Sequence, residues 1–275
     1  MREIKPKSLI AVIALRALPG APLYDGNDQL IIDQALDDLG KYMKVGVDAI
    51  KIENDFDVPY IQPPLPKEAV ELTIKIAKDI RSRFDGPLGI QMLEAANELS
   101  LEIANEAKLD FIRVEAFVYG HVGPDGIIEP CAGKIMRLRK QLGCEDIKIY
   151  ADVKKKHTSH SPAADLDIGD EIMQAELFLV DGVIVTSKFT GFEPETNDLI
   201  KARKATKLPI LIGSGMTAEN IGEYFDLADY FIVGSTLRKD GKFLAETDMS
   251  RLEEFVSRFN EIKQKKTSKY RDHNA

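Results

Sequence analysis

The sequence predicts a single-domain (β/α)8 TIM barrel, an α/β fold, over residues 1–265. Apolar runs of strand length alternate with longer segments of helical period along the whole chain, which is typical of parallel strands joined by helical crossovers. Eight such units can be traced in 275 residues, and that number fits a closed barrel better than an open sheet. No linker marks a second domain. Residues 266–275 are basic and are expected to form a disordered C-terminal tail.

The predicted strands are short apolar runs that follow one another at regular intervals. They span residues 9–15, 48–54, 87–93, 110–115, 147–153, 181–186, 209–214 and 229–235. Between them, residues 28–45 carry apolar side chains at helical spacing, and residues 250–262 repeat this pattern. Each helix should therefore bury one stripe against the strands.

The even-numbered strands share a further regularity, because each is entered through an aspartate. These residues are Asp48, Asp110, Asp181 and Asp229. Strand starts lie at the end of a barrel that serves stability rather than chemistry. We therefore assign the four carboxylates to turn and cap roles.

Composition limits the class of protein. The formal net charge of −8 argues against nonspecific binding to nucleic acid or acidic lipid. The longest apolar run near the N-terminus, residues 9–15, is too short to span a membrane. Cys131 and Cys144 are expected to be reduced thiols. The sequence predicts a cytoplasmic protein without membrane insertion, and it is compatible with a homo-oligomer.

Alternation along the strands directs several charged side chains into the barrel. The residues expected to face inward include Lys51, Glu53, Arg113, Glu115, Asp152, Lys154 and Thr186. Buried charges need partners or a ligand, so a self-neutralising network and an active site are both compatible with this pattern. Four of these residues end their strands and would surround the C-terminal mouth, where the active sites of barrel enzymes lie. They are Glu53, Glu115, Asp152 and Lys154. They are the predicted catalytic residues.

Loop residues add candidates at the same mouth. His157 is the histidine best placed for proton transfer, and Lys188 is a candidate substrate-binding lysine or Schiff-base amine. Glu53, Asp57 and Asp152 are candidate magnesium ligands, although their spacing is not diagnostic and no cofactor is required. Asp55 is assigned to a solvated acidic loop.

The last two strands end in similar glycine corners. Gly213, Ser214 and Gly215 follow one strand, and Gly234 and Ser235 follow the next. Loops at this position of a barrel often bind phosphate through backbone amides beside a helix N-terminus. Thr217 is a candidate cap for such a helix. The pair of corners predicts a site for a phosphorylated small molecule.

These motifs together resemble the BtpA/SgcQ family. The likeness rests on ALPGAP at 17–22, GVDAIKIENDFDVPY at 46–60, FIRVEAF at 111–117, ADVKKKH at 151–157, VTSKFTG at 185–191, GSGMTAENI at 213–221 and IVGSTLRKDG at 232–241. The resemblance implies a phosphate-binding TIM barrel. It also implies site roles for Glu53, Asn54, Asp57, Asp152, His157, Thr190 and Gly191, and it adds Lys156 as an alternative to Lys154. Thr186 and Lys188 are substrate-binding candidates because of their positions at the end of the sixth strand and just after it. The chain departs from the family at Ala14, where a histidine is usual, and at Glu115, where an asparagine is usual.

Two functions remain open on the sequence. The first is an enzyme acting on a phosphorylated sugar or ribosyl compound, by nucleosidase-like glycosidic cleavage or by isomerase or aldolase chemistry. The second is a noncatalytic assembly factor, because one branch of the family is named for photosystem I biogenesis.

Overall fold

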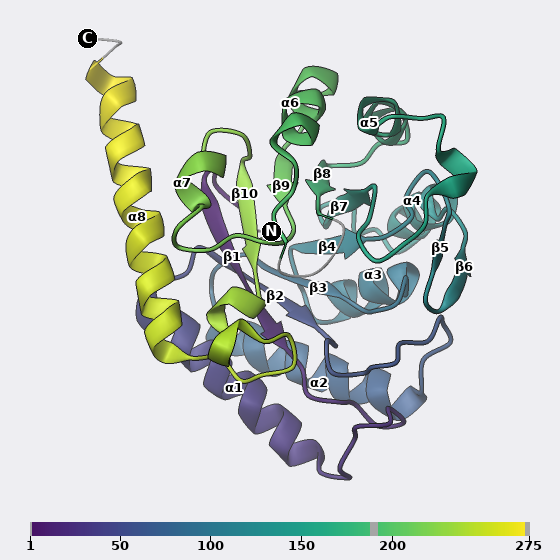
Figure 1. The fold of residues 1–275 in the computed structure, drawn as a ribbon. Helices are drawn as coiled ribbons and strands as arrows, with labels where there is room; N and C mark the ends of the chain where they lie inside the picture. The colour runs from purple at the N-terminus through teal and green to yellow at the C-terminus, as the bar shows by residue number, and fades with distance from the viewer. Residues whose placement is uncertain (1, 188–191, 273–275) are drawn as a thin grey trace.

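Eight parallel strands form a closed barrel surrounded by helices, as the sequence predicted. The computed structural model describes residues 2–187 and 192–272. The barrel strands are β1 (Ser8–Ala14), β2 (Ala49–Glu53), β3 (Leu88–Gln91), β4 (Phe111–Val114), β7 (Lys148–Val153), β8 (Gly182–Val185), β9 (Ile210–Ile212) and β10 (Tyr230–Val233). They pair in chain order, and β10 closes the ring by pairing with β1 (Figure 1). All strands therefore present their carboxyl ends at one mouth.

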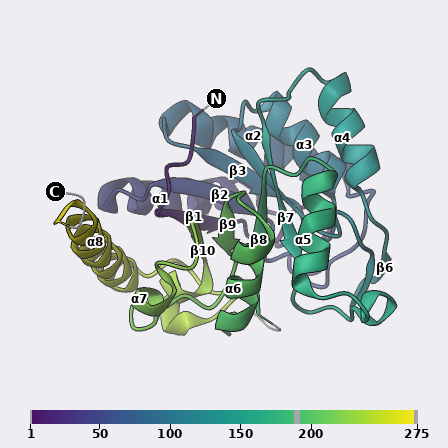
Figure 2. The same ribbon diagram turned by 90° about the horizontal axis from the view of Figure 1, so that it is seen from above.

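The helices lie outside the strands, as Figures 1 and 2 show. They are α1 (Asp28–Val45), α2 (Lys67–Arg83), α3 (Asn97–Glu106), α4 (Ala132–Gln141), α5 (Ile168–Leu177), α6 (Thr196–Ala205), α7 (Ile221–Tyr224) and α8 (Met249–Asp272). Helix α8 continues to Asp272, into the segment that the sequence assigned to a C-terminal tail. None of the helices within the described ranges is both long and apolar enough to cross a membrane.

A small hairpin that the sequence did not predict follows β4. It consists of β5 (His121–Gly123) and β6 (Gly126–Ile128), paired antiparallel. The N–H of Val122 donates to the carbonyl of Ser159, and the N–H of Ser159 donates back. The hairpin is thereby fastened to the loop after β7, beside the barrel mouth.

The apolar core has two parts. The larger part lies between strands and helices, where residues such as Ile50, Ile112 and Phe255 are buried. The smaller part fills the barrel and includes Ile10, Phe111 and Tyr230. The charged inward residues lie nearer the mouth, so the apolar interior forms the floor beneath them.

The four aspartates before the even-numbered barrel strands each join two neighbouring strands. Their carboxylates accept backbone N–H groups from Leu9 (2.9 Å), Leu88 (3.0 Å), Ile149 (3.0 Å) and Ile210 (2.9 Å) respectively. A cation contacts each carboxylate, namely Lys263, Arg81, Arg139 and Arg203. The predicted stabilising role is confirmed, and its form is a strand-to-strand clamp rather than a helix cap.

Asp110→Asn is expected to lower the free energy of unfolding by about 2–4 kcal/mol, because the Asp110 side chain is 3% exposed and pairs with Arg81 at 2.9 Å. Denaturant unfolding measures the loss. Asp48→Asn is the matched control, since the Asp48 side chain is 32% exposed and its loss should cost about 1 kcal/mol. Equal losses in the two variants would contradict the importance of the buried clamp.

Candidate functional site

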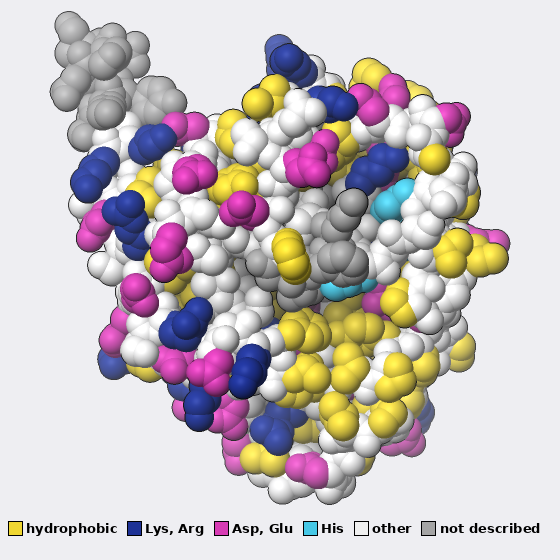
Figure 3. Space-filling view, in the orientation of Figure 1, with side chains coloured by type: hydrophobic (Ala, Val, Ile, Leu, Met, Phe, Trp, Pro, Cys, Tyr) yellow, Lys and Arg dark blue, Asp and Glu magenta, His cyan; other side chains and the backbone are white. Residues whose placement is uncertain are grey.

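A cavity of about 370 Å³ opens at the C-terminal mouth of the barrel. Its charged lining residues are Glu53, Asp55, Glu94, Arg113, Glu115, Lys155, Lys156 and Arg238. Its apolar lining includes Val12, Leu93, Met216, Ile232 and Phe243. A volume of this size suits a small organic ligand. Leu23 and Ile61 in loops and Ile127 in β6 are exposed. Figure 3 shows apolar side chains gathered on the lower right of the face it presents.

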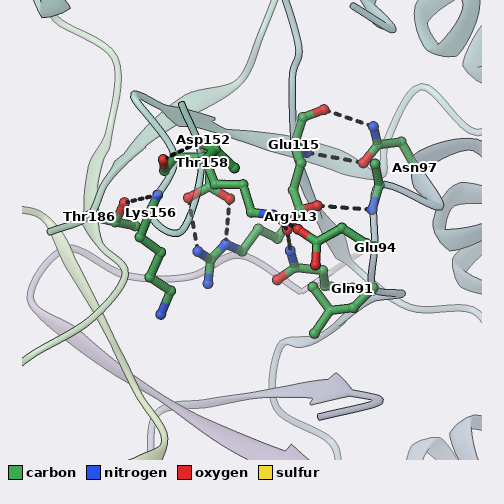
Figure 4. Close-up of polar contacts among 12 residues, drawn as sticks. Gln91, Glu94, Asn97, Arg113, Glu115, Asp152, Lys156, Thr158 and Thr186 are labelled. Carbon is green, nitrogen blue, oxygen red and sulfur yellow. Dashed lines mark hydrogen bonds and ion pairs between the residues drawn. The ribbon is translucent and has the colours of Figure 1, made fainter. Parts of the chain in front are cut away.

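Arg113 organises the charges below the cavity. Its Nε and Nη2 donate to the two oxygens of Asp152 at 2.8 and 2.9 Å, as Figure 4 shows. Glu53 lies 3.7 Å from the same guanidinium and also pairs with Lys51. Because Asp152 does not line the cavity while Arg113 does, Asp152 reaches a ligand only through Arg113. The self-neutralising network considered from the sequence is present, and it forms the base of the cavity.

Glu115 stands at the centre of a second polar group. Its carboxylate accepts from Gln91 Nε2 at 2.7 Å and from the Ala95 N–H at 2.9 Å (Figure 4). Lys155 Nζ lies 3.2 Å from Glu115 and also pairs with Glu94. Burial raises the pKa of Glu115 to about 8, with Asp152 adding to the rise. Burial, the larger effect, and the nearby Lys156 together lower the pKa of Lys155 to about 7. This pair can exchange a proton near neutral pH.

The three consecutive lysines after β7 point in different directions. Lys154 has φ of 48°, so the strand alternation ends there and the expected inward orientation of Lys154 is wrong. Lys154 Nζ instead donates to the carbonyls of Ala163 at 3.3 Å and Leu166 at 2.8 Å. Lys155 and Lys156 line the cavity in its place.

Lys156 is the unpaired cation of the cavity among the described residues. Its backbone N–H donates to Thr186 Oγ1 at 3.2 Å, which fixes the start of the side chain. Every other cation that lines the cavity is matched to a carboxylate. Burial, the largest effect, and the nearby Arg113 lower the pKa of Lys156 to about 8, although Glu53 opposes the change. Lys156 therefore gives the cavity a cation that is not held in an ion pair within the described residues.

The expectation that Asp55 belongs to a solvated loop is wrong. Asp55 is 2% exposed, and its Oδ2 lies 2.5 Å from Nη2 of Arg238. The Arg238 guanidinium lies over the ring of Phe243, 5.6 Å from its centroid. This buried pair connects the loop after β2 to the loop after β10. Arg238 is thus held by Asp55.

Asn54 and Asp57 hold loops together and do not line the cavity. Asn54 bonds both backbone groups of Leu93, accepting from its N–H at 2.7 Å and donating to its carbonyl at 3.1 Å. Asp57 accepts from the Leu18 N–H at 2.7 Å and from Asn54. Of the predicted magnesium ligands, Glu53 and Asp152 both contact Arg113, whereas Asp57 does not line the cavity. Within the described ranges, no three His, Cys, Asp or Glu residues are grouped to hold a metal ion.

The two glycine corners lie at the same cavity. Gly213, Ser214, Gly215, Gly234 and Ser235 all line it. Thr236 Oγ1 donates to the Met216 carbonyl at 2.8 Å, which joins the two corners directly. The backbone N–H groups of Ser214, Gly215, Ser235 and Thr236 have no hydrogen-bond acceptor within the part of the chain that is described. These amides are available to an anion.

The loop after β9 is held by a reciprocal bond. The Thr217 N–H donates to Asn220 Oδ1 at 2.8 Å, and the Asn220 N–H donates to Thr217 Oγ1 at 3.3 Å. Asn220 Nδ2 also donates to the carbonyl of Gly215 at 2.9 Å. The helix that follows, α7, has only four residues. Loop amides rather than a long helix dipole would therefore meet an anion here.

Two of the remaining candidates, His157 and Thr186, lie at or near the mouth. His157 lines the cavity, and burial lowers its pKa with help from Lys156 and Lys155. Thr186 lies behind Lys156 as its hydrogen-bond acceptor. Lys188, Thr190 and Gly191 lie outside the described residues. Four cavity-lining residues were not predicted from the sequence, namely Gln91, Glu94, Lys155 and Tyr60. Of these, Gln91 ends strand β3, so strand alternation could have predicted that its side chain faces inward.

Comparison with known proteins gives the family. The model of the BtpA family matches residues 5–261. An uncharacterized mitochondrial protein of Caenorhabditis elegans is 37% identical over 261 residues, covering 93% of this chain and 94% of the relative. The photosystem I biogenesis protein BtpA of Synechocystis is 31% identical over 264 residues, covering 95% and 91%.

A solved structure with the same fold is thiamine phosphate pyrophosphorylase from Pyrococcus furiosus. It superposes with a TM-score of 0.58 at 15% identity, covering 94% of this chain and 99% of that chain. This similarity supports the barrel architecture, whereas the family follows from the sequence match over almost the whole length. The chain belongs to the BtpA family.

Proposed function

We propose that the mouth cavity binds a phosphorylated sugar or ribosyl compound, with its phosphate on the two glycine corners. The observation that carries the proposal is that unpaired amides of Ser214, Gly215, Ser235 and Thr236 surround one cavity that also holds the unpaired cation Lys156. Backbone amides and a nearby cation are the groups that commonly bind a phosphate. The similar thiamine phosphate pyrophosphorylase, whose name refers to a phosphorylated compound, adds support.

We further propose that the protein is an enzyme acting on the part of the ligand beyond the phosphate. Glu53, Glu115 and His157 line the cavity and can transfer protons. Glu115 and Lys155 supply an acid and a base near neutral pH. Asp152 would act as a positioning residue through Arg113. These groups suit proton transfer beside a carbonyl, and they also suit cleavage of a glycosidic bond.

Calorimetric titration with ribose 5-phosphate and with ribose tests the binding proposal. Ribose 5-phosphate should bind, and ribose should bind at least roughly tenfold more weakly, a difference of about 1.4 kcal/mol. Competition by inorganic phosphate should follow from a shared anion site. Equal affinity for the two sugars, or no binding of any sugar phosphate in a panel, would argue against the phosphate site.

Binding of the phosphate is expected to weaken as the pH rises from 7 to 9. The pKa of Lys156 is lowered to about 8 by burial, so this cation becomes neutral over that range. The pKa of Glu115 is raised to about 8, so a negative charge appears in the cavity over the same range. Both changes oppose an anion. Titrations at several pH values measure the slope, which Lys156→Met should reduce; an affinity that increases with pH would contradict this assignment.

An assembly role is the second candidate, because the Synechocystis relative at 31% identity is named for photosystem I biogenesis. Such a role is compatible with ligand binding at the mouth. Turnover assays with a panel of sugar phosphates and ribosyl compounds separate the two candidates. Product formation that Glu115→Gln abolishes supports the enzyme, whereas binding without turnover of any compound supports the assembly role.

A further inference from the structure

We propose that Lys156 is a nucleophilic amine that forms an imine with the carbonyl group of a phosphorylated aldehyde or ketone. This inference deepens the proposed function and rests on it, since the glycine corners would hold the phosphate of the same molecule. It selects carbonyl chemistry over cleavage of a glycosidic bond.

The placement of Lys156 is the first argument. Its side chain lines the cavity, and its backbone is fixed by the bond to Thr186. Figure 4 shows the side chain extending away from Thr186. Lys155 and Lys154 are engaged, by carboxylates and by backbone carbonyls respectively. Within the described residues the Lys156 amine makes no hydrogen bond and has no carboxylate oxygen within 4.0 Å, so this amine can approach a ligand without breaking an ion pair.

The surroundings of Lys156 favour a reactive amine. A lysine becomes nucleophilic when it is desolvated or lies near another cation, because both effects increase the neutral fraction. Lys156 experiences both, through burial and through Arg113, and its pKa falls to about 8. An ordinary exposed lysine with a pKa near 10.4 is protonated almost completely at neutral pH.

The cavity also contains groups that can move the required protons. In the proposed step, the neutral amine attacks the carbonyl carbon to form a carbinolamine, and loss of water gives the imine. Glu53 and Asp55 line the same cavity, and both interact electrostatically with Lys156. A carboxyl group can donate the proton that leaves with the hydroxyl as water, and its carboxylate can take the proton released by the nitrogen. A protonated imine keeps the positive charge opposite the phosphate.

Reductive trapping tests the inference. The full-length protein is incubated with glyceraldehyde 3-phosphate and sodium cyanoborohydride at pH 7.5, and the adduct is located by peptide mass spectrometry. Hydride reduction of the imine adds the mass of the aldehyde less one oxygen atom. We expect labelling at Lys156 to exceed that at Lys154 at least tenfold. Lys156→Arg should lose the adduct, whereas Lys154→Arg should keep it.

Phosphate binding is measured separately, so that the two proposals can fail independently. Lys156→Arg preserves the charge and should still bind ribose 5-phosphate. If wild type binds sugar phosphates but is labelled equally at Lys154 and Lys156, the imine proposal is overturned while the phosphate site stands. If no sugar phosphate binds but unphosphorylated glyceraldehyde labels Lys156 selectively, the reactive lysine stands and the phosphate site fails.

Discussion

Replacing Arg113 by methionine is expected to lower the free energy of unfolding by about 3–5 kcal/mol, because it leaves buried carboxylates without their cation. Arg113 is 5% exposed and holds Asp152 with two hydrogen bonds of 2.8 and 2.9 Å. Glu53 lies 3.7 Å from the same side chain. Urea unfolding followed by circular dichroism gives the difference from wild type.

A double variant isolates the cause. Arg113→Met combined with Asp152→Asn removes both members of the pair and should recover much of the lost stability, since replacing a whole buried ion pair is often nearly neutral. Arg137→Met is a control on an exposed arginine that donates to the Gly133 carbonyl of its own helix, with an expected effect within about 0.5 kcal/mol. A single Arg113 variant as stable as this control would refute the account of the charged base.

Gly215→Ala is expected to weaken binding of a sugar phosphate by roughly tenfold to a hundredfold, or about 1.4–2.8 kcal/mol. Gly215 has φ of +78°, and a Cβ there would lie 2.1 Å from the Phe192 carbonyl oxygen. An added methyl group would therefore displace the corner whose amides face the cavity. Calorimetric titration with ribose 5-phosphate measures the change.

Gly40→Ala provides the matched control, because Gly40 lies in α1 with nothing within 4 Å of an added Cβ. It should leave binding unchanged and stabilise the fold by about 0.5–1 kcal/mol. If Gly215→Ala bound sugar phosphates as tightly as Gly40→Ala, the corner after β9 would not be part of the anion site.

Hydrophobic alternation was sufficient to predict the barrel and much of the site. The strands with unbroken alternation gave correct inward directions for Glu53, Arg113 and Glu115, because successive side chains of an extended strand face opposite ways. The glycine corners were found because they occupy equivalent places after β9 and β10. Both signals are local, so they can be read from a single sequence.

The incorrect predictions concern residues whose positions are set by loop geometry or by contacts between distant parts of the chain. At Lys154 the backbone turns to positive φ, and strand alternation then predicts the wrong member of a lysine triplet. Asp55 and Arg238 are 183 residues apart in the chain, so nothing near either residue indicates their pairing. Loop geometry and long-range ion pairs of this kind depend on the closed barrel, and the sequence pattern carries no signal for them.

The four aspartate clamps divide the barrel into two-strand units, and forming each unit costs less chain entropy than closing the whole ring. Each clamp joins residues that are only 39, 22, 32 or 19 positions apart, whereas closure of the ring pairs Ser8 with Tyr230. The cost of closing a loop increases with its length, so each two-strand unit can be fixed at a lower cost than the complete ring. The barrel thus consists of four two-strand units, each fixed by contacts between residues close in the chain. The pairing of β1 with β10 closes the ring, and this closure also brings the loop that carries Asp55 next to the loop that carries Arg238.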